Sequence, residues 1–191
     1  MKVVLAEKPS VAIEIAKALR ATNRNDGYME GNGYQITWAY GHLISLQTPE
    51  EILGRKLEIE DLPYLPKEIP LKVIDDSGGK KQFKIVSKLF NSADEIICAT
   101  DAGREGELIF RLIYEVSKAK APIKRLWISA YNEEIIKKAF TSLVNGSETE
   151  ALYQGGKFRQ IADWYLGYNS SIVLSRKNGF PLKIGRVKTP T

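Results

Sequence analysis

Three carboxylates lie within seven residues of a glycine-containing segment near the middle of the chain. The segment reads DAGREGE from Asp101 to Glu107 and directly follows an apolar run at 95–100 that is typical of a buried strand. Carboxylates crowded at a strand end repel one another unless a cation lies among them. Mg²⁺ prefers oxygen ligands and uses few protein groups, so the pattern is consistent with a magnesium site that leaves room for phosphate.

The same acids also fit a plainer role. Taken alone, Asp101 or Glu105 could complement the dipole and the free amides of the helix predicted from Leu108 onward. A second group of residues, far away in the sequence, favours the metal site over this helix-capping role. Glu7 and Lys8 directly follow the short apolar run at 3–6, which is typical of a buried parallel strand.

These strand ends predict a common site. Pro9 begins a segment with the apolar periodicity of a helix that packs on a sheet. In open α/β sheets, ligands bind at the carboxyl ends of the strands. The sequence therefore predicts that Glu7 lies beside Asp101 and Glu105.

The elements that must position these residues alternate along the chain. Apolar strands and amphipathic helices predict an α/β fold with a mostly parallel sheet covered on both faces. Residues 25–81 depart from this pattern, with a hairpin signal at Gly31-Asn32-Gly33, four prolines and a predicted exposed loop at 75–81. Further expectations are a strand at 124–128, a helix capped by Asn132, and core positions for Trp127 and Trp164.

The predicted domain boundary lies at Asn145-Gly146-Ser147. It gives a first domain over 1–145, with an inserted excursion at about 25–81, and a mainly helical second domain over 146–191. The segment from 148 to about 175 reads as one long helix or two. Residues 151–191 carry seven basic residues against one acid, which suggests contact with a phosphate backbone or a solvated basic face.

Composition narrows the class of protein. The 191 residues are 43% hydrophobic and 27% charged, with a net charge of +5, as in a soluble globular protein. The sequence contains no apolar run of membrane-spanning length and no signal-peptide pattern, so no membrane partner is expected. The single cysteine, Cys98, falls in a predicted buried strand, which suits a reducing compartment; the cytoplasm is the default location.

Two of these motifs resemble the signatures of the Toprim domain, in the form found in type IA DNA topoisomerases of the topoisomerase III kind. They are EKPS from Glu7 and DAGREGE from Asp101. The similarity continues in order through GHL at 41–43, RLWIS at 125–129, RQIADW at 159–164 and GRVKTPT at 185–191. It implies a Rossmann-like Toprim domain followed by the start of a helical, winged-helix-like DNA-binding domain, truncated at Thr191.

The resemblance also implies roles for individual residues. The catalytic centre would comprise Glu7, Lys8, Asp101 and Glu105; the three acids would bind Mg²⁺ and Lys8 would lie near the scissile phosphate. Single-stranded DNA is the implied partner, contacted by Arg104, Arg159, Asp163, Arg186, Lys188 and Thr189. Plainer readings stay open: an ion pair for Arg104, another between Arg159 and Asp163, and a structural role for His42, which is otherwise a neighbour of the active site.

The sequence departs from the family pattern at two points. Gly103 stands where the family has a second aspartate, which favours one metal ion over two; Glu107 is expected to cap the helix rather than to replace that ligand. The family attacks DNA with a tyrosine in a Tyr-Pro-Arg-Thr-like segment, and none of the nine tyrosines here precedes Pro-Arg. We therefore expect an amino-terminal fragment that is inactive alone and has the remaining domains of the same polypeptide as partners.

The reaction implied is the cleavage and rejoining of one DNA strand through a covalent phosphotyrosine, which needs no ATP. The sequence accordingly has no Walker-type phosphate loop. Two other functions remain open. One is a stand-alone Toprim nuclease or primase-like phosphotransferase, and the other is a non-catalytic, magnesium-dependent module that binds nucleic acid.

Overall fold

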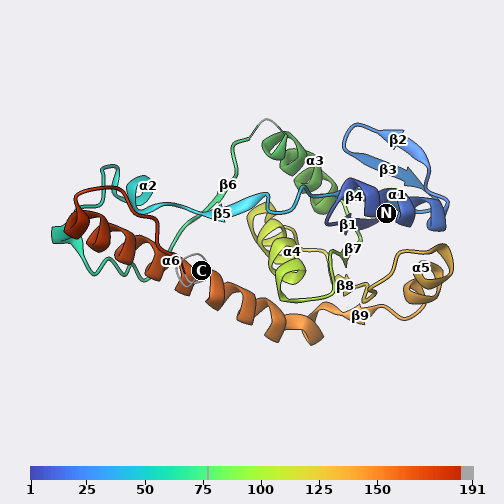
Figure 1. The fold of residues 1–191 in the computed structure, drawn as a ribbon. Coiled ribbons are helices and arrows are strands. Elements are labelled where there is room, and N and C mark those ends of the chain that lie inside the picture. Colours follow the sequence, from blue (N-terminus) through green and yellow to red (C-terminus); the bar gives the residue numbers. More distant parts are fainter. Residues whose placement is uncertain (77, 186–191) are drawn as a thin grey trace. The chain divides into compact units, whose positions relative to one another are not determined.

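The computed structural model describes residues 1–76 and 78–185 (Figure 1). The chain forms two compact units. The first comprises residues 1–45 and 73–156, and the second comprises residues 46–72 together with the described residues from 157 onward. Each unit therefore contains two separate stretches of the chain.

The first unit is built on a seven-stranded sheet of order β2-β3-β4-β1-β7-β8-β9 (Figure 1). Its centre is parallel. There β1 (Lys2–Ala6) lies between β4 (Tyr34–Trp38) and β7 (Glu95–Ala99), and β7 also pairs with β8 (Ile123–Arg125). Residues 3–6 and 96–99 are almost completely buried, as expected for continuous apolar runs in strands covered on both faces.

The edges of this sheet are antiparallel. On one side β2 (Asn23–Asn25) pairs with β3 (Tyr28–Gly31), which in turn pairs with β4; on the other side β9 (Val144–Asn145) pairs with β8. The predicted hairpin is confirmed, and its two-residue turn at Asn32 and Gly33 has φ of 49° and 83°. The prediction of a mostly parallel sheet is thus confirmed for the strands that carry the acids.

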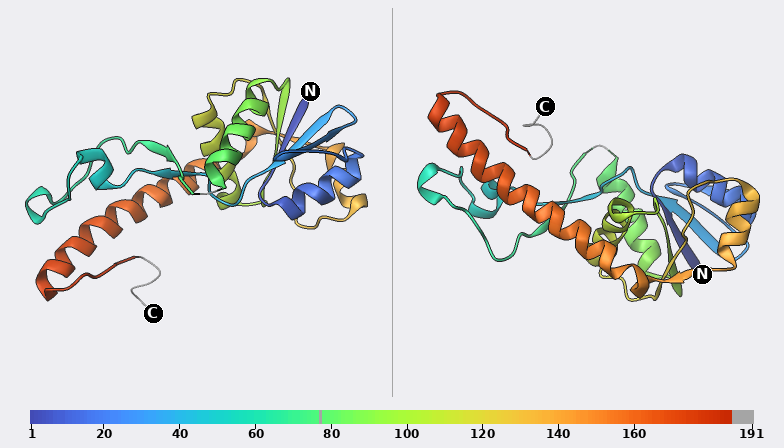
Figure 2. Two further views of the ribbon diagram at one scale, coloured as in Figure 1. Left: turned by 90° about the horizontal axis from the view of Figure 1, so that it is seen from above. Right: turned by 60° about the horizontal axis from the view of Figure 1, so that its bottom comes forward.

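Helices cover both faces of the sheet, as the alternation of elements predicted (Figure 2). Helices α1 (Pro9–Leu19) and α5 (Glu133–Phe140) pack against each other, as do α3 (Gly79–Asn91) and α4 (Arg104–Ser117). The predicted cap of α5 is confirmed, because the side chain of Asn132 accepts a hydrogen bond of 2.9 Å from the amide of Ile135.

Three sequence boundaries differ from the structure. The predicted excursion at 25–81 includes β4, which belongs to the parallel centre because its residues pair with all of β1. The predicted loop at 75–81 is shorter, since α3 begins at Gly79. The predicted strand at 124–128 ends at Arg125, where its pairing with β7 ends.

The second unit combines one long helix with a segment that has little regular structure. The helix α6 (Glu150–Asn178) begins in the first unit after the 3₁₀ turn η2 (Gly146–Thr149) and continues through the second. The chain leaves the first unit through β5 (Ile44–Leu46) and returns through β6 (Leu71–Val73). Between these strands lie α2 (Pro49–Leu53) and the 3₁₀ turn η1 (Ile59–Asp61).

Side chains of α6 hold this segment through its backbone. The indole of Trp164 donates to the carbonyl of Gln47 at 2.9 Å, and the hydroxyl of Tyr165 donates to the carbonyl of Pro66 at 2.6 Å. The amide of Asn169 accepts from the backbone N–H of Tyr64 at 2.8 Å and donates to the carbonyl of the same residue at 3.1 Å. Trp164 is buried, as predicted.

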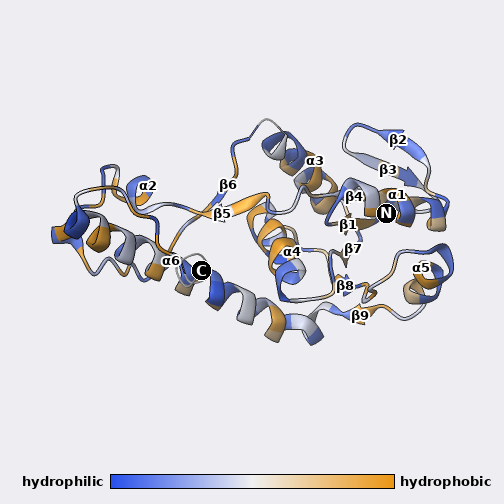
Figure 3. Cartoon of the chain, in the orientation of Figure 1, coloured by the Kyte–Doolittle hydropathy of each residue, from blue (hydrophilic) through white to orange (hydrophobic). Residues whose placement is uncertain are grey.

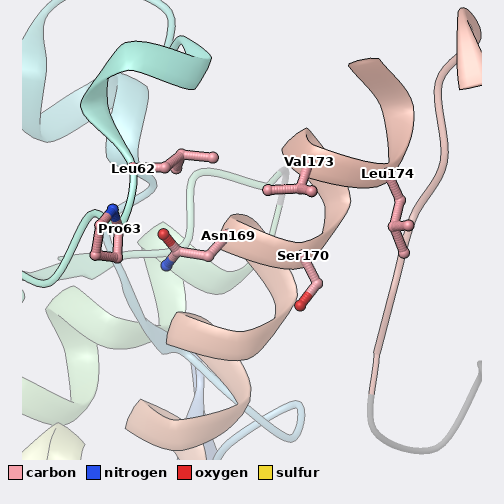
Figure 4. Close-up of a pocket in the computed structure, with 6 residues that line it drawn as sticks. All are labelled: Leu62, Pro63, Asn169, Ser170, Val173 and Leu174. Carbon is pink, nitrogen blue, oxygen red and sulfur yellow. The ribbon is translucent and has the colours of Figure 1, made fainter. Parts of the chain in front are cut away.

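A cavity of about 440 Å³ lies in this second unit (Figure 4). Its lining residues come from the segment and from α6: Leu62, Pro63, Asn169, Ser170, Val173 and Leu174.

The division of the chain into units differs from the predicted domain boundary at 145/146. Residues 46–72 belong to the same unit as most of α6, and α6 itself starts in the first unit. Polar and apolar residues are mixed along α6 (Figure 3). Within residues 1–76 and 78–185, no helix is long and apolar enough to cross a membrane.

Candidate active site

The structure brings Glu7 and Asp101 together at the carboxyl edge of the sheet. Ala6 and Ala99 are opposite each other in the parallel pair β1 and β7, so the residues that follow them leave the sheet side by side. An oxygen of Glu7 accepts a hydrogen bond of 3.1 Å from the backbone N–H of Asp101. Glu7 is partly exposed and Asp101 is exposed, so both carboxylates are accessible to a ligand.

His42 and Glu105 form a second contact in the same unit. Glu105 lies in the first turn of α4, and its Oε1 is 2.6 Å from Nε2 of His42. The amide of Gly41, next to the histidine, donates to the carbonyl of Glu7 at 3.4 Å. The loop after β4 therefore places His42 next to the predicted acids, as the GHL segment suggested.

Two exposed basic residues, Lys8 and Arg104, are neighbours of these acids in the sequence. Lys8 is exposed at the start of α1, and Arg104 is exposed at the start of α4. The first turns of helix α6 pass close to the start of α4. A β-carbon added at Gly156 of α6 would lie 3.0 Å from the carbonyl oxygen of Arg104. A larger residue at Gly156 would push these two helices apart.

A buried arginine holds the backbone of the acidic turn. Arg125, at the end of β8, is fully buried. Its guanidinium donates to the carbonyls of Cys98 at 3.0 Å, Thr100 at 2.7 Å and Asp101 at 2.6 Å. Charge-assisted hydrogen bonds from the buried side therefore fix the backbone of the turn that carries Asp101.

Glu107 balances the charge of this arginine. Its carboxylate is fully buried, with Oε2 3.2 Å from Nε of Arg125 in an ion pair that lacks hydrogen-bond geometry. The other oxygen accepts from Arg111 at 3.0 Å and from the hydroxyl of Thr149 at 2.8 Å. Glu107 is thus neither the predicted helix cap nor a metal ligand, because it lies on the inner side of α4 where a buried arginine requires a counter-charge.

The two glycines of the turn differ in what they require. A β-carbon at Gly106 would lie 2.2 Å from the carbonyl oxygen of Asp101, so only glycine fits. Gly103 has an extended backbone with φ of 174°, and apart from its chain neighbours no atom of the described residues lies within 4 Å of an added β-carbon. The backbone therefore accepts the aspartate that the family pattern has at this position.

Two aromatic residues follow β8 near the turn. The hydroxyl of Tyr131 is 3.5 Å from Oδ1 of Asp101, and partial burial, together with the charge of that aspartate, raises the pKa of Tyr131. Trp127 is 47% exposed, although the sequence predicted a core position. It lies two residues beyond the last paired residue, Arg125, and its ring packs on the guanidinium of that arginine, whose Cζ is 5.3 Å from the ring centre.

The remaining predicted DNA contacts fall elsewhere. Arg159 and Asp163 lie in α6, in the second unit, and form an ion pair of 3.8 Å one helical turn apart. Both side chains are about half exposed. Arg186, Lys188 and Thr189 lie outside the described residues.

The carboxylate oxygens of the acids are the kind of ligand that a hard cation prefers. Among the residues that the structure describes, no group of three or more His, Cys, Asp or Glu side chains is arranged to hold a metal. An oxygen of Glu7 contacts the backbone N–H of Asp101, whereas Glu105 contacts His42. Accessible carboxylates at one edge of the sheet fit Mg²⁺, which usually takes one or two of them and completes its shell with water and substrate phosphate.

Comparisons with known proteins find related sequences and a similar fold. A model of the Toprim domain matches residues 2–131. A DNA topoisomerase 3 from Shouchella clausii is 47% identical over 100% of this chain and 26% of its own length, and one from Bacillus cereus is 46% identical over 99% and 26%. Full-length topoisomerase I from Thermotoga maritima has a similar fold, with a TM-score of 0.61 at 24% identity over 91% of this chain and 26% of that one. The chain spans about a quarter of the length of these relatives.

Proposed function

The chain belongs to the Toprim domain family, and from this membership we propose that it is the metal-binding and DNA-binding part of a type IA DNA topoisomerase. The parent enzyme would cleave and rejoin one DNA strand through a phosphotyrosine, without ATP. The attacking tyrosine would come from outside this chain. The observation that carries the proposal is the contact between Glu7 and Asp101 at the carboxyl edge of the sheet.

In this proposal Glu7, Asp101 and Glu105 would hold Mg²⁺. The ion would neutralise charge on the phosphate oxygens and orient the phosphodiester. The backbone amide of Asp101 anchors the Glu7 carboxylate, and Arg125 fixes the backbone of the turn that carries Asp101, so one donor group and the backbone of the second are positioned before any ligand binds. Glu105 would turn from His42 to complete the set.

Positive side chains of both units would bind the DNA. Lys8 and Arg104 are exposed at the starts of two helices near the acids, where they would contact phosphate. Arg159 in α6 would contact the backbone, with Asp163 orienting its guanidinium through their ion pair. Such contacts would bind single-stranded DNA with strong salt dependence and little sequence preference.

Calorimetric titration of the chain with Mg²⁺ tests the metal site. We expect a binding heat that is lost in Glu7→Gln and Asp101→Asn, because each substitution removes a charged oxygen donor. Glu14→Gln is the matched control, since Glu14 is an exposed helical acid paired with Lys17. Equal heats in all four proteins would reject the site.

A glycine substitution tests how many ions bind. Gly103→Asp adds a carboxylate to the turn at a position with free space. We expect tighter binding of Mg²⁺ or a second equivalent in this variant, and one equivalent in the natural sequence. The same stoichiometry and affinity in both proteins would remove Gly103 as the cause of the lower metal capacity.

An assay with single-stranded DNA separates the topoisomerase part from a nuclease. With Mg²⁺ present, we expect the chain to bind the DNA without nicking it. Magnesium-dependent nicking that disappears in Asp101→Ala would instead favour the Toprim nuclease. Adding ATP should change neither result.

A further inference from the structure

Trp127 occupies an unusual position for an apolar residue of the first unit. It lies two residues after the end of β8, whose neighbour β7 leads into the acidic turn. The amide of Leu126 donates to the carbonyl of Cys98 at 2.9 Å, so Trp127 leaves the sheet at the edge where Asp101 does. The residues before it, Arg125 and Leu126, are buried, whereas its own side chain is 47% exposed.

A single exposed apolar residue is common, so exposure alone decides nothing. The way the ring is held is more specific. The guanidinium of Arg125 lies 5.3 Å from the ring centre and also donates to the carbonyl of Asp101 at 2.6 Å. One buried group therefore contacts both the aromatic ring and the turn that carries the predicted metal ligand.

This arrangement leaves the ring in a defined place. A cation under an aromatic face attracts the ring electrostatically, and Arg125 is itself immobilised by three carbonyls and Glu107. With one face against the guanidinium, the exposed surface is available to a flat ligand. A ring that is already ordered loses little conformational entropy when such a ligand binds.

We propose that Trp127 is a stacking platform for a nucleobase of single-stranded DNA whose phosphate lies at the Glu7–Asp101 site. The inference rests on the proposed function. Aromatic side chains stack on every base, so this contact adds affinity without sequence preference. It also favours single strands, because the bases of a duplex are already stacked and paired.

Fluorescence of the chain can report this contact directly. The sequence has three tryptophans, and Trp127 is the exposed one: Trp164 is buried, and the indole nitrogen of Trp38 is inaccessible to solvent. We expect a thymidine oligonucleotide to quench the emission and an oligonucleotide of abasic residues to quench it much less. Trp127→Phe should remove the quenching signal but keep the affinity, which is then measured by fluorescence anisotropy of a labelled oligonucleotide.

The size of the effect is tested with Trp127→Ala. We expect its affinity for the thymidine oligonucleotide to fall about tenfold, with affinity for the abasic oligonucleotide and Mg²⁺ binding unchanged. Ile135→Ala is the control, because Ile135 is an exposed apolar residue of the same unit.

Three results would overturn the inference. If Mg²⁺ binds but Trp127→Ala holds the thymidine oligonucleotide as tightly as the natural sequence, the platform is rejected and the proposed function stands. If the natural sequence binds neither Mg²⁺ nor single-stranded DNA, both proposals fail. Equal quenching by a duplex and by a single strand would also reject a stacking role.

Discussion

The two compact units stabilise their polar groups in different ways. The first buries a full ion pair, Glu107 with Arg125, directly under the acidic turn. In the second unit, neutral side chains of α6, such as Asn169, hydrogen-bond the backbone of residues 46–72. The ion pairs described there, including Arg55 with Asp61, are on the surface.

This difference predicts how the stability of each unit should respond to substitutions. Charges that are shielded from water interact strongly, and removing one leaves the other without a counter-charge. The candidate active site therefore depends on a few buried groups. A segment held by separate neutral hydrogen bonds can instead open locally while the sheet stays folded. Substitutions matched between the two units can test this contrast.

The largest effect is expected from Glu107→Ala. This change leaves Arg125 buried without its counter-charge, and it also removes a partner of Arg111. We expect the free energy of unfolding of the first unit to fall by about 3–5 kcal/mol, measured by urea denaturation with circular dichroism. Glu133→Ala removes an acid from the exposed pair with Lys137 and should cause no measurable change. Equal losses in the two variants would show that burial of the ion pair with Arg125 does not make it more important for stability than an exposed pair.

The next effect should come from Gly106→Ala. Its methyl group would meet the carbonyl oxygen of Asp101, so the turn must move, at a cost of about 1–3 kcal/mol. The same denaturation measurement applies, together with the affinity for Mg²⁺, which should fall as Asp101 shifts. Gly103→Ala is the control because an added methyl group has space there. A stable Gly106→Ala variant with normal Mg²⁺ binding would show that the turn is more adaptable than its packing indicates.

In the second unit, Asn169→Ala should act locally. It removes both hydrogen bonds to the backbone of Tyr64, at a cost of about 1–3 kcal/mol for the partly buried groups left behind. Hydrogen exchange followed by mass spectrometry should show faster exchange in residues 46–72 and unchanged exchange in β1 and β7. The control is Asn178→Ala, which removes an exposed hydrogen bond from the side-chain amide to the carbonyl of Leu174. Faster exchange throughout the sheet would indicate that the units do not open independently.

The sequence predicted the parts of the site that follow a general rule of chain geometry. Glu7 and Asp101 each follow an apolar strand, and adjacent parallel strands end at the same edge, so their contact was predictable. The hairpin at Asn32 and Gly33 and the cap at Asn132 were predictable as well, since each rests on local backbone chemistry.

The remaining features depend on register and on distant partners. Nothing in the spacing indicates that Glu107 points inward, because its partner Arg125 comes from strand β8, which follows α4 in the chain. Trp127 was placed in the core by its apolar side chain, yet the sheet pairing ends two residues earlier. The packing of the proline-rich stretch within 46–72 against α6 could not be predicted from the sequence, because these contacts use backbone groups that every residue has.

The smallest expected effect is a pH dependence that belongs to the first unit alone. Burial raises the pKa of the Cys98 thiol to about 11, and the second unit has no cysteine. The unfolded thiol ionises near pH 9, so the unfolded state loses its proton first as the pH rises. Stability should therefore be constant below pH 9 and fall by about 1.4 kcal/mol by pH 10 because of this group. Urea denaturation of the natural sequence and of Cys98→Ala between pH 8 and 10 gives this term as a difference, which cancels the titration of other residues. Parallel profiles in the two proteins would mean that the thiol reaches water, and that the strand leading into the acidic turn opens more readily than its burial indicates.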